Sequence, residues 1–407
     1  MAYSRNRMFF GFSTMVMLCL ALYIAQRLLW NVPFSLWEKW GFFILILALS
    51  QSISIMRLLV TRAAGYPFYW MRIGGYASTL FILLGSLTFL RDICLLLLQV
   101  CGEIFSLDWV EDALSALMGE KSVFLLLCIS ALAAGTGMWS ALRVPRVRKR
   151  ELNLKNLPSA LDGLRIVQLS DLHMGSTYKA LWLEKVVEKC NALAPDLVLI
   201  TGDLVDNTPA VLTEDMRLLT RLRARLGVLI AVGNHEYYTG LMPWVDTWRN
   251  MGLDVLLNQW KAFEMNGEKL IVAGVADASA EKYPGLLLPD ARAARAGAPE
   301  GFTILMAHQP RAAVEYAKLG YDLQLSGHTH GGQYFFLFPL ISFLNKGFRS
   351  GSYVVDSMIL HVSPGTGLWG YVPIRIGASS EISLLVLRAA TKSPLPGKQG
   401  SINSRFF

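Results

Sequence analysis

The stretch LQLSGHTHGGQ, residues 323–333, places two histidines on either side of one threonine, between a short apolar run and a pair of glycines. The chain has 407 residues and only six histidines, so this spacing is unusual. On an extended segment, residues i and i+2 point to the same side. His328 and His330 are therefore expected to present two imidazoles to one place, and the glycines to let the backbone turn sharply beside them.

Four further polar clusters follow short apolar runs: SDLH (Asp171, His173), GDLVD (Asp203, Asp206), GNHE (Asn234, His235, Glu236) and AHQP (His308). Uninterrupted apolar runs of this length are typical of strands buried on both faces, and helical patterns at 179–193, 211–226 and 244–251 separate the earlier runs. This alternation predicts an α/β domain whose sheets are covered by helices. Because ligands collect at the carboxyl ends of strands in such sheets, we expect the clusters to converge.

The clusters contain the ligands of a metal site. Five of the six histidines lie in them, beside Asp, Asn or Gly, and only His361 lies apart. A single histidine at a strand end is more often structural, but five ordered clusters favour metal binding. Imidazole suits Zn, Fe, Mn or Co, and the carboxylate and amide oxygens favour a harder ion such as Mn. The clusters contain no cysteine, which argues against a structural zinc site.

The ordered set D-x-H, GD, GNHE, a single His and GHTH resembles the calcineurin-like metallophosphoesterases. The stretches IVQLSDLH and GHTHGGQ look most like those of membrane-attached bacterial members. The resemblance covers residues 160–390 and implies a two-layered β-sandwich flanked by helices. It also implies two divalent metal ions, with Mn preferred and Fe, Zn or Co as alternatives.

The resemblance assigns roles to individual residues. It places Asp171, His173 and His330 on the first ion, Asn234, His308 and His328 on the second, and Asp203 between the two. His235 would act on the substrate, Glu236 would orient His235, and Asp206 would be structural or would support a metal ligand. The implied reaction is hydrolysis of a phosphate ester or pyrophosphate by a hydroxide held between the ions, with His235 giving a proton to the leaving oxygen.

Residues 1–142 are mostly apolar and predict a membrane region. Four runs, at 8–30, 40–60, 73–90 and 122–142, each approach the roughly 20 residues that a helix needs to span a bilayer. The first run has no A-x-A site after it, which disfavours a secretory signal. Arg91 and Asp92 interrupt the third run, and the sequence leaves open whether this pair lies at the interface or is buried among the helices.

Loop charges predict the orientation. The N-terminus, the second loop and the segment RVPRVRKR (143–150) are rich in Arg and Lys, whereas the third loop is acidic. Positive residues stay inside, so both termini and the catalytic domain are expected in the cytoplasm of a bacterium, on a multi-pass protein of the inner (plasma) membrane. The predicted parts are a membrane region (1–142), a basic linker (143–158), a catalytic domain (159–390) and a disordered tail (391–407).

The bilayer and a phosphate ester are the expected partners, and the net charge of +8 needs no nucleic acid to explain it. Phe335 to Ile341 form an apolar stretch followed by Lys346 and Arg349, which either dips into the bilayer to admit a lipid-linked substrate or simply covers the core. Trp369, Tyr371 and Arg375 form a second candidate wall for the phosphate. The alternatives are a tethered phosphodiesterase or phosphatase of soluble nucleotides or phosphoproteins, and a membrane scaffold without activity.

Overall fold

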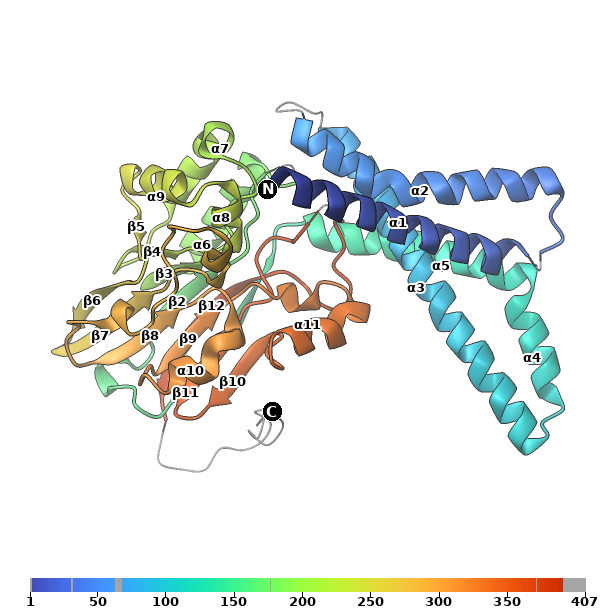
Figure 1. The fold of residues 1–407 in the computed structure, drawn as a ribbon. Helices are drawn as coiled ribbons and strands as arrows, with labels where there is room; N and C mark the ends of the chain where they lie inside the picture. The colour runs from blue at the N-terminus through green and yellow to red at the C-terminus, as the bar shows by residue number, and fades with distance from the viewer. Residues whose placement is uncertain (1, 31, 63–67, 176, 371, 391–407) are drawn as a thin grey trace. The chain divides into compact units, whose positions relative to one another are not determined.

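The computed structural model describes residues 2–30, 32–62, 68–175, 177–370 and 372–390 (Figure 1). The chain divides into two compact units, Met1–Ser140 with Gly370–Ile374, and Ala141–Trp369 with Arg375–Phe407. The tail predicted to be disordered and Tyr371 lie outside the described residues.

The first unit is helical. Its helices are α1 (Ala2–Leu29), α2 (Leu36–Arg62), α3 (Phe68–Phe105), α4 (Trp109–Met118) and α5 (Glu120–Leu142), the last of which ends in the second unit. Among the described residues, the segments Arg72–Phe105 and Glu120–Leu142 are long and apolar enough to cross a membrane. The count of four spans therefore stays a prediction.

Helix α3 continues through the charged pair that interrupts its apolar sequence. The Asp92 carboxylate accepts hydrogen bonds from Tyr23 Oη and Arg27 Nε, both at 2.6 Å, on helix α1. Arg91 is buried and donates to the carbonyl of Arg27 at 3.0 Å. Hydrogen bonds with α1 thus offset the free-energy cost of placing these two charged side chains in an apolar helix.

The second unit contains two mixed six-stranded sheets. The first, in spatial order, is β1 (Arg146–Leu154), β12 (Glu381–Ala389), β2 (Arg165–Leu169), β3 (Leu197–Thr201), β4 (Val228–Ala231) and β5 (Asp254–Val255). The second is β10 (Gly351–Val355), β11 (Met358–Val362), β9 (Leu323–Ser326), β8 (Phe302–Met306), β7 (Glu268–Gly274) and β6 (Gln259–Met265). Strands β2, β3 and β4 run parallel, as do β7, β8 and β9.

The layers follow from the apolar runs of the sequence. One core joins the facing sides of the two sheets and includes Ile166, Leu199, Val272 and Ile304. The outer face of the first sheet packs against helices α6 (Ala180–Ala192), α7 (Pro209–Met216) and α9 (Leu241–Asn250), and the outer face of the second against α10 (Ala313–Ala317). Every residue of β3 and β8 is buried because both faces of these strands are covered. The predicted helix-flanked two-layer α/β fold is confirmed.

The stretch expected to form a basic linker has a different structure. Residues Arg146–Leu154 form β1, which pairs in parallel with β12 along nine positions at the edge of the first sheet. Arg150 makes a two-pronged ion pair with the buried Glu381, at 2.5 and 2.9 Å. The alternation in RVRKRELNL is that of an edge strand with basic residues outward, which a count of charges alone does not separate from a linker.

Candidate metal centre

Each side chain predicted to bind metal follows the carboxyl end of a strand. Asp171 and His173 follow β2, Asp203 follows β3, Asn234 and His235 follow β4, His308 follows β8, and His328 and His330 follow β9. The first three strands belong to one sheet and the last two to the other. The site therefore lies where the ends of the two sheets meet.

The structure brings these side chains into one cluster. Potential ligand atoms of Asp171, His173 and His330 lie within 4.8 Å of one another, as do those of Asp203, His308 and His328, and those of His173, Asp203 and His235. His173 Nε2 is 3.2 Å from His330 Nε2, and His308 Nε2 is 3.1 Å from Asp203 Oδ2. Overlapping groups of this kind have the ligand set of a dinuclear metal site.

The backbone that presents these ligands is not extended. Asp171, His173, Asp203, His328 and His330 all have positive φ, between 48° and 69°. The expectation that His328 and His330 lie on an extended segment and point to the same side by strand alternation was therefore wrong, and Asp171 and His173 have the same left-handed backbone. Left-handed turns after the strand ends bring these side chains together instead. Non-glycine residues with positive φ are characteristic of functional sites.

The glycines of the motifs are required by close packing between the loops. A Cβ on Gly327 would collide with Ser170 Oγ, and one on Gly233 would collide with Asp203 Oδ1. The backbone at these two glycines therefore lies directly against side chains of loops that follow other strands. This packing explains why GHTH and GNHE each begin with glycine.

Asp206 holds two histidines at once. Its Oδ1 lies 2.8 Å from His173 Nδ1 and 2.7 Å from His235 Nδ1. Burial would raise the pKa of Asp206, but His173 and His235 hold it well below its usual value, so the group is a carboxylate that only accepts. Both Nδ1 atoms must then donate, which leaves Nε2 of each ring facing the cluster. The sequence left a structural role and a role in supporting the ligands both open for Asp206, and did not predict its contact with His235.

Glu236 does not orient His235, contrary to expectation. Its buried carboxylate instead accepts three backbone N–H bonds, from Gly233 at 2.6 Å, Asp203 at 3.0 Å and Leu204 at 2.8 Å. These bonds fix the turn that carries Asp203 against the start of helix α8 (Asn234–Thr239). Glu236 is thus a positioning residue for the backbone, and Asp206 is the one that holds His235.

A Glu236→Gln protein is expected to be less stable by about 2 kcal/mol, because the amide NH₂ leaves at least one buried backbone donor without an acceptor. For a domain of this size that corresponds to a fall in Tm of roughly 5 °C, measurable by thermal unfolding of the detergent-solubilised protein. Glu214→Gln is the matched control, because Glu214 is 82% exposed and contacts only Arg217 among the salt bridges of the described residues. An unchanged Tm for Glu236→Gln would contradict the positioning role.

The donor atoms of the cluster fit cations. His308 Nδ1 lies 2.7 Å from the carbonyl oxygen of Thr201 and donates to it, so Nε2 is the ring atom that faces the Asp203 carboxylate, at 3.1 Å. Asn234 Oδ1 is buried and has no hydrogen-bond partner among the described residues. Buried carboxylate and amide oxygens are stable only beside positive charge, supplied by protons on the histidines or by metal ions. Divalent ions satisfy these groups.

The electrostatics of the cluster point the same way. Burial would raise the pKa of Asp203, but the neighbouring His308 and His235 hold it well below its usual value. Burial would lower the pKa of His308, but Asp203 and Asp171 raise it well above the usual value. Burial raises the pKa of Asp171, whose carboxylate also accepts the backbone N–H of His328 at 3.0 Å. The cluster thus attracts positive charge.

The second candidate wall is only partly formed. Arg375 is buried, and its guanidinium donates to the carbonyl oxygens of His330 and Pro364, each at 2.8 Å, so it holds the histidine loop and does not face a phosphate. Trp369 is 54% exposed, and its backbone is tied to the side chain of Gln333. His361 is fully buried in β11 with Ser352 Oγ at 2.9 Å, outside the cluster.

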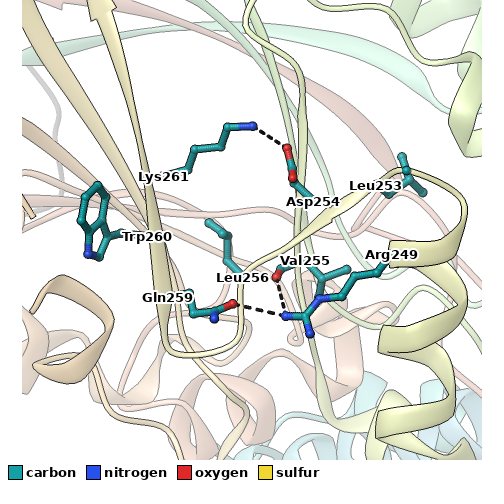
Figure 2. A pocket seen from close by; sticks show the side chains of 9 residues that line it. Arg249, Leu253, Asp254, Val255, Leu256, Gln259, Trp260 and Lys261 are labelled. Carbon is teal, nitrogen blue, oxygen red and sulfur yellow. Dashed lines mark hydrogen bonds and ion pairs between the residues drawn. The ribbon is translucent and has the colours of Figure 1, made fainter.

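A separate cavity of about 470 Å³ lies between the edge strands β5 and β6 (Figure 2). Its charged groups already have partners: Lys261 pairs with Asp254 at 2.6 Å, and Arg249 Nη2 is 3.2 Å from Gln259 Oε1. None of the predicted site residues lines it. This cavity is therefore separate from the cluster at the strand ends.

The fold and cluster together define a two-sheet α/β metallohydrolase, and the comparisons identify its family. Residues 164–332 match the model of the calcineurin-like phosphoesterase family. A "transmembrane protein with metallophosphoesterase domain" from Danio rerio is 38% identical over 300 residues, which cover 71% of this chain and 68% of that protein. An uncharacterized metallophosphoesterase from Campylobacter jejuni is 31% identical over 391 residues, 93% of this chain and 99% of its own.

Among solved structures, a 5'-nucleotidase precursor from Thermus thermophilus aligns with a TM-score of 0.35 and 15% identity, covering 55% of this chain and 54% of that one. The chain belongs to the calcineurin-like metallophosphoesterase family, and is a metal-dependent phosphoester hydrolase. The ion that each ligand holds, and the role of His235, stay predictions.

Proposed function

We propose that the protein is a membrane-anchored phosphoesterase that hydrolyses a phosphate ester or pyrophosphate bond of a lipid-linked substrate at the cytoplasmic face of the membrane. The observation that carries the hydrolytic part is the convergence of histidine and carboxylate atoms from five strand ends on one space. We infer that Asp171, His173 and His330 hold one ion, that Asn234, His308 and His328 hold the other, and that Asp203 bridges them. Such ions supply Lewis acidity and a nucleophile at neutral pH.

The protein's own residues then position the substrate and move a proton. Asp206 fixes His235 by its Nδ1, so Nε2 is the atom that meets a phosphate ester bound at the cluster. The backbone N–H of His235 donates to Asp203 Oδ1 at 2.8 Å, which sets the ring's place relative to the cluster. We propose that His235 Nε2–H donates to the leaving oxygen as the bond to phosphorus breaks.

Membrane anchoring rests on the first unit and on the relatives. The segments Arg72–Phe105 and Glu120–Leu142 can cross a bilayer by length and composition, and the Danio rerio relative is named a transmembrane protein. We propose that α1 and α2 span as well, giving four spans. The Arg- and Lys-rich loops then favour a cytoplasmic location for both termini and the catalytic unit.

The lipid-linked substrate is supported by an exposed apolar segment beside the cluster. Helix α11 (Phe338–Leu344) begins eight residues after His330, and Leu340, Phe343 and Leu344 are 52%, 82% and 56% exposed. Arg349 ties the segment to the histidine loop, since its Nη1 donates to the Gly331 carbonyl at 2.7 Å and its guanidinium lies 3.9 Å from the Phe338 ring centre. A short helix with such a surface suits the interface of a bilayer.

The test uses full-length protein in detergent, loaded with Mn²⁺, and three substrates: a soluble phosphodiester, a soluble monoester and a nucleotide-linked lipid in mixed micelles. We expect the micellar lipid to be preferred. We also expect Leu340→Ser/Phe343→Ser to raise KM for the lipid about tenfold, because apolar contact with the micelle is lost, and to leave the soluble diester unchanged. Leu181→Ser, at a 65% exposed position of α6, is the surface control.

Each other result has a definite meaning. Equal use of soluble and micellar substrates, with no effect of the double variant, would overturn the lipid part and leave a tethered hydrolase of soluble nucleotides or phosphoproteins. Binding of two ions without hydrolysis of any substrate would favour a scaffold that has kept its metal domain.

A further inference from the structure

Two tyrosine rings, Tyr238 and Tyr283, lie beside the cluster and have no role in the proposed reaction. Tyr238 is on helix α8, three residues after His235, and the two ring centres are 5.1 Å apart. The Tyr238 side chain is 49% exposed, although it lies next to buried ligands. An exposed ring of this size beside a reacting centre is available to a substrate.

A second ring extends this surface. Tyr283 is 6.4 Å from Tyr238 and 6.1 Å from Tyr237, centre to centre. Tyr237 is buried, and its hydroxyl donates to the carbonyl of Leu287 at 3.0 Å, which ties the loop after Tyr283 to helix α8. The hydrogen bond of Tyr237 thus keeps the loop that carries Tyr283 against helix α8, and places the rings of Tyr238 and Tyr283 next to each other.

The position of His235 indicates which part of a substrate would contact the rings of Tyr238 and Tyr283. Its Nδ1 is held by Asp206, so its Nε2 is directed to the leaving oxygen of a phosphate on the metal cluster. The atoms attached to that oxygen must then lie over or beside the His235 ring. Tyr238, tilted 55° to that ring, is the next side chain along the helix that they reach.

We propose that Tyr238 and Tyr283 form a leaving-group subsite that selects substrates whose leaving group carries a planar aromatic ring, bonded either directly to the scissile oxygen or, as in a nucleotide, through a sugar. This proposal rests on the proposed function, since it takes the metal cluster as the place of the phosphate. Face or edge contact with tyrosine favours flat rings over saturated groups of the same size. The subsite determines which phosphate ester is bound and adds no chemical step.

The experiment compares ligands that differ only in the ring. The first pair is a nucleoside monophosphate and the matching sugar phosphate without its base; the second is phenyl phosphate and cyclohexyl phosphate. Dissociation constants are measured by calorimetric titration of the Mn²⁺-loaded full-length protein in detergent. The His235→Asn background is used so that turnover does not consume the ligand. We expect the nucleoside ligand to bind about tenfold tighter than its partner, and phenyl roughly fivefold tighter than cyclohexyl.

Variants assign the preference to the two tyrosine rings. Tyr238→Ala and Tyr283→Ala should each reduce both ratios, whereas Tyr238→Phe, which keeps the ring, should preserve them. An unchanged affinity for the non-aromatic member of each pair, the sugar phosphate or cyclohexyl phosphate, shows that the variant is folded and holds its ions. Leu181→Ser again serves as the surface control.

Equal affinities within both pairs, or ratios that survive both alanine substitutions, would overturn the subsite. Hydrolysis of the soluble diester by the unmodified protein is measured separately. If the protein hydrolyses the diester but binds the aromatic and non-aromatic ligands equally, only the subsite proposal is overturned. If it binds the aromatic ligands more tightly but hydrolyses no substrate, only the proposed function is overturned.

Discussion

An Asp203→Asn protein is expected to bind fewer than two Mn²⁺ ions and to hydrolyse a phosphodiester at least about a thousandfold more slowly, because an amide cannot share two anionic oxygens between two cations. Asn keeps the shape of Asp and can still accept the His235 backbone N–H that now reaches Asp203 Oδ1 at 2.8 Å. The fold should therefore survive. Metal content is measured by mass spectrometry of the dialysed protein, and turnover at saturating substrate.

The control for this variant is Asp254→Asn, which removes an exposed carboxylate paired with Lys261 outside the cluster. It should retain two ions and full turnover. If Asp203→Asn also retained both, Asp203 would not bridge the ions, and the assignment of ligands would have to be rebuilt around Asp171, His173 and His330, the one group that lacks Asp203.

The second large effect is expected from His235→Asn. Turnover should fall by roughly 10²- to 10⁴-fold, since proton donation to the leaving oxygen is lost, while both ions remain bound. The fall should be greatest for an alkoxide leaving group and smallest for a nitrophenolate, which departs without a proton. The measurement is kcat against leaving-group pKa for a series of diesters, with metal content determined in parallel.

A steeper dependence of kcat on leaving-group pKa in the variant is the signature of a lost general acid. Equal losses across the series would show instead that His235 stabilises charge on the phosphoryl group without delivering a proton. Loss of metal together with activity would make the histidine a ligand, which the third group of converging atoms, His173, Asp203 and His235, makes geometrically accessible.

The sequence predicted the site from one regularity: polar clusters at the ends of apolar runs. That inference holds because parallel strands share a direction, so the ends of β2, β3 and β4, and of β8 and β9, meet at one edge. The mechanism inferred for H-x-H was wrong, since His328 and His330 lie in a left-handed turn. Local spacing predicts which residues converge and cannot supply the dihedral angles set by packing between loops.

The roles of side chains that are set by hydrogen bonds to distant parts of the chain were the least predictable. Glu236 adjoins His235 in the chain, yet consecutive side chains on a helix start point apart, and its carboxylate binds backbone donors instead. Asp206 reaches His235 across 29 positions, a contact that spacing does not reveal. Arg375 was predicted beside the phosphate, but four nearby backbone carbonyls provide enough acceptors to bury it.

The division of the ligands between two sheets has a mechanical consequence. His173 and His330 stand 157 positions apart in the chain and on loops of different layers, so an ion held by both would cross-link the sandwich at its edge. Ions that bind only the folded chain stabilise it in proportion to the logarithm of their concentration. The metal concentration would then determine the stability of the contact between the two sheets as well as the rate of ester hydrolysis. Removal of the metal by a chelator would destabilise the domain at its catalytic site.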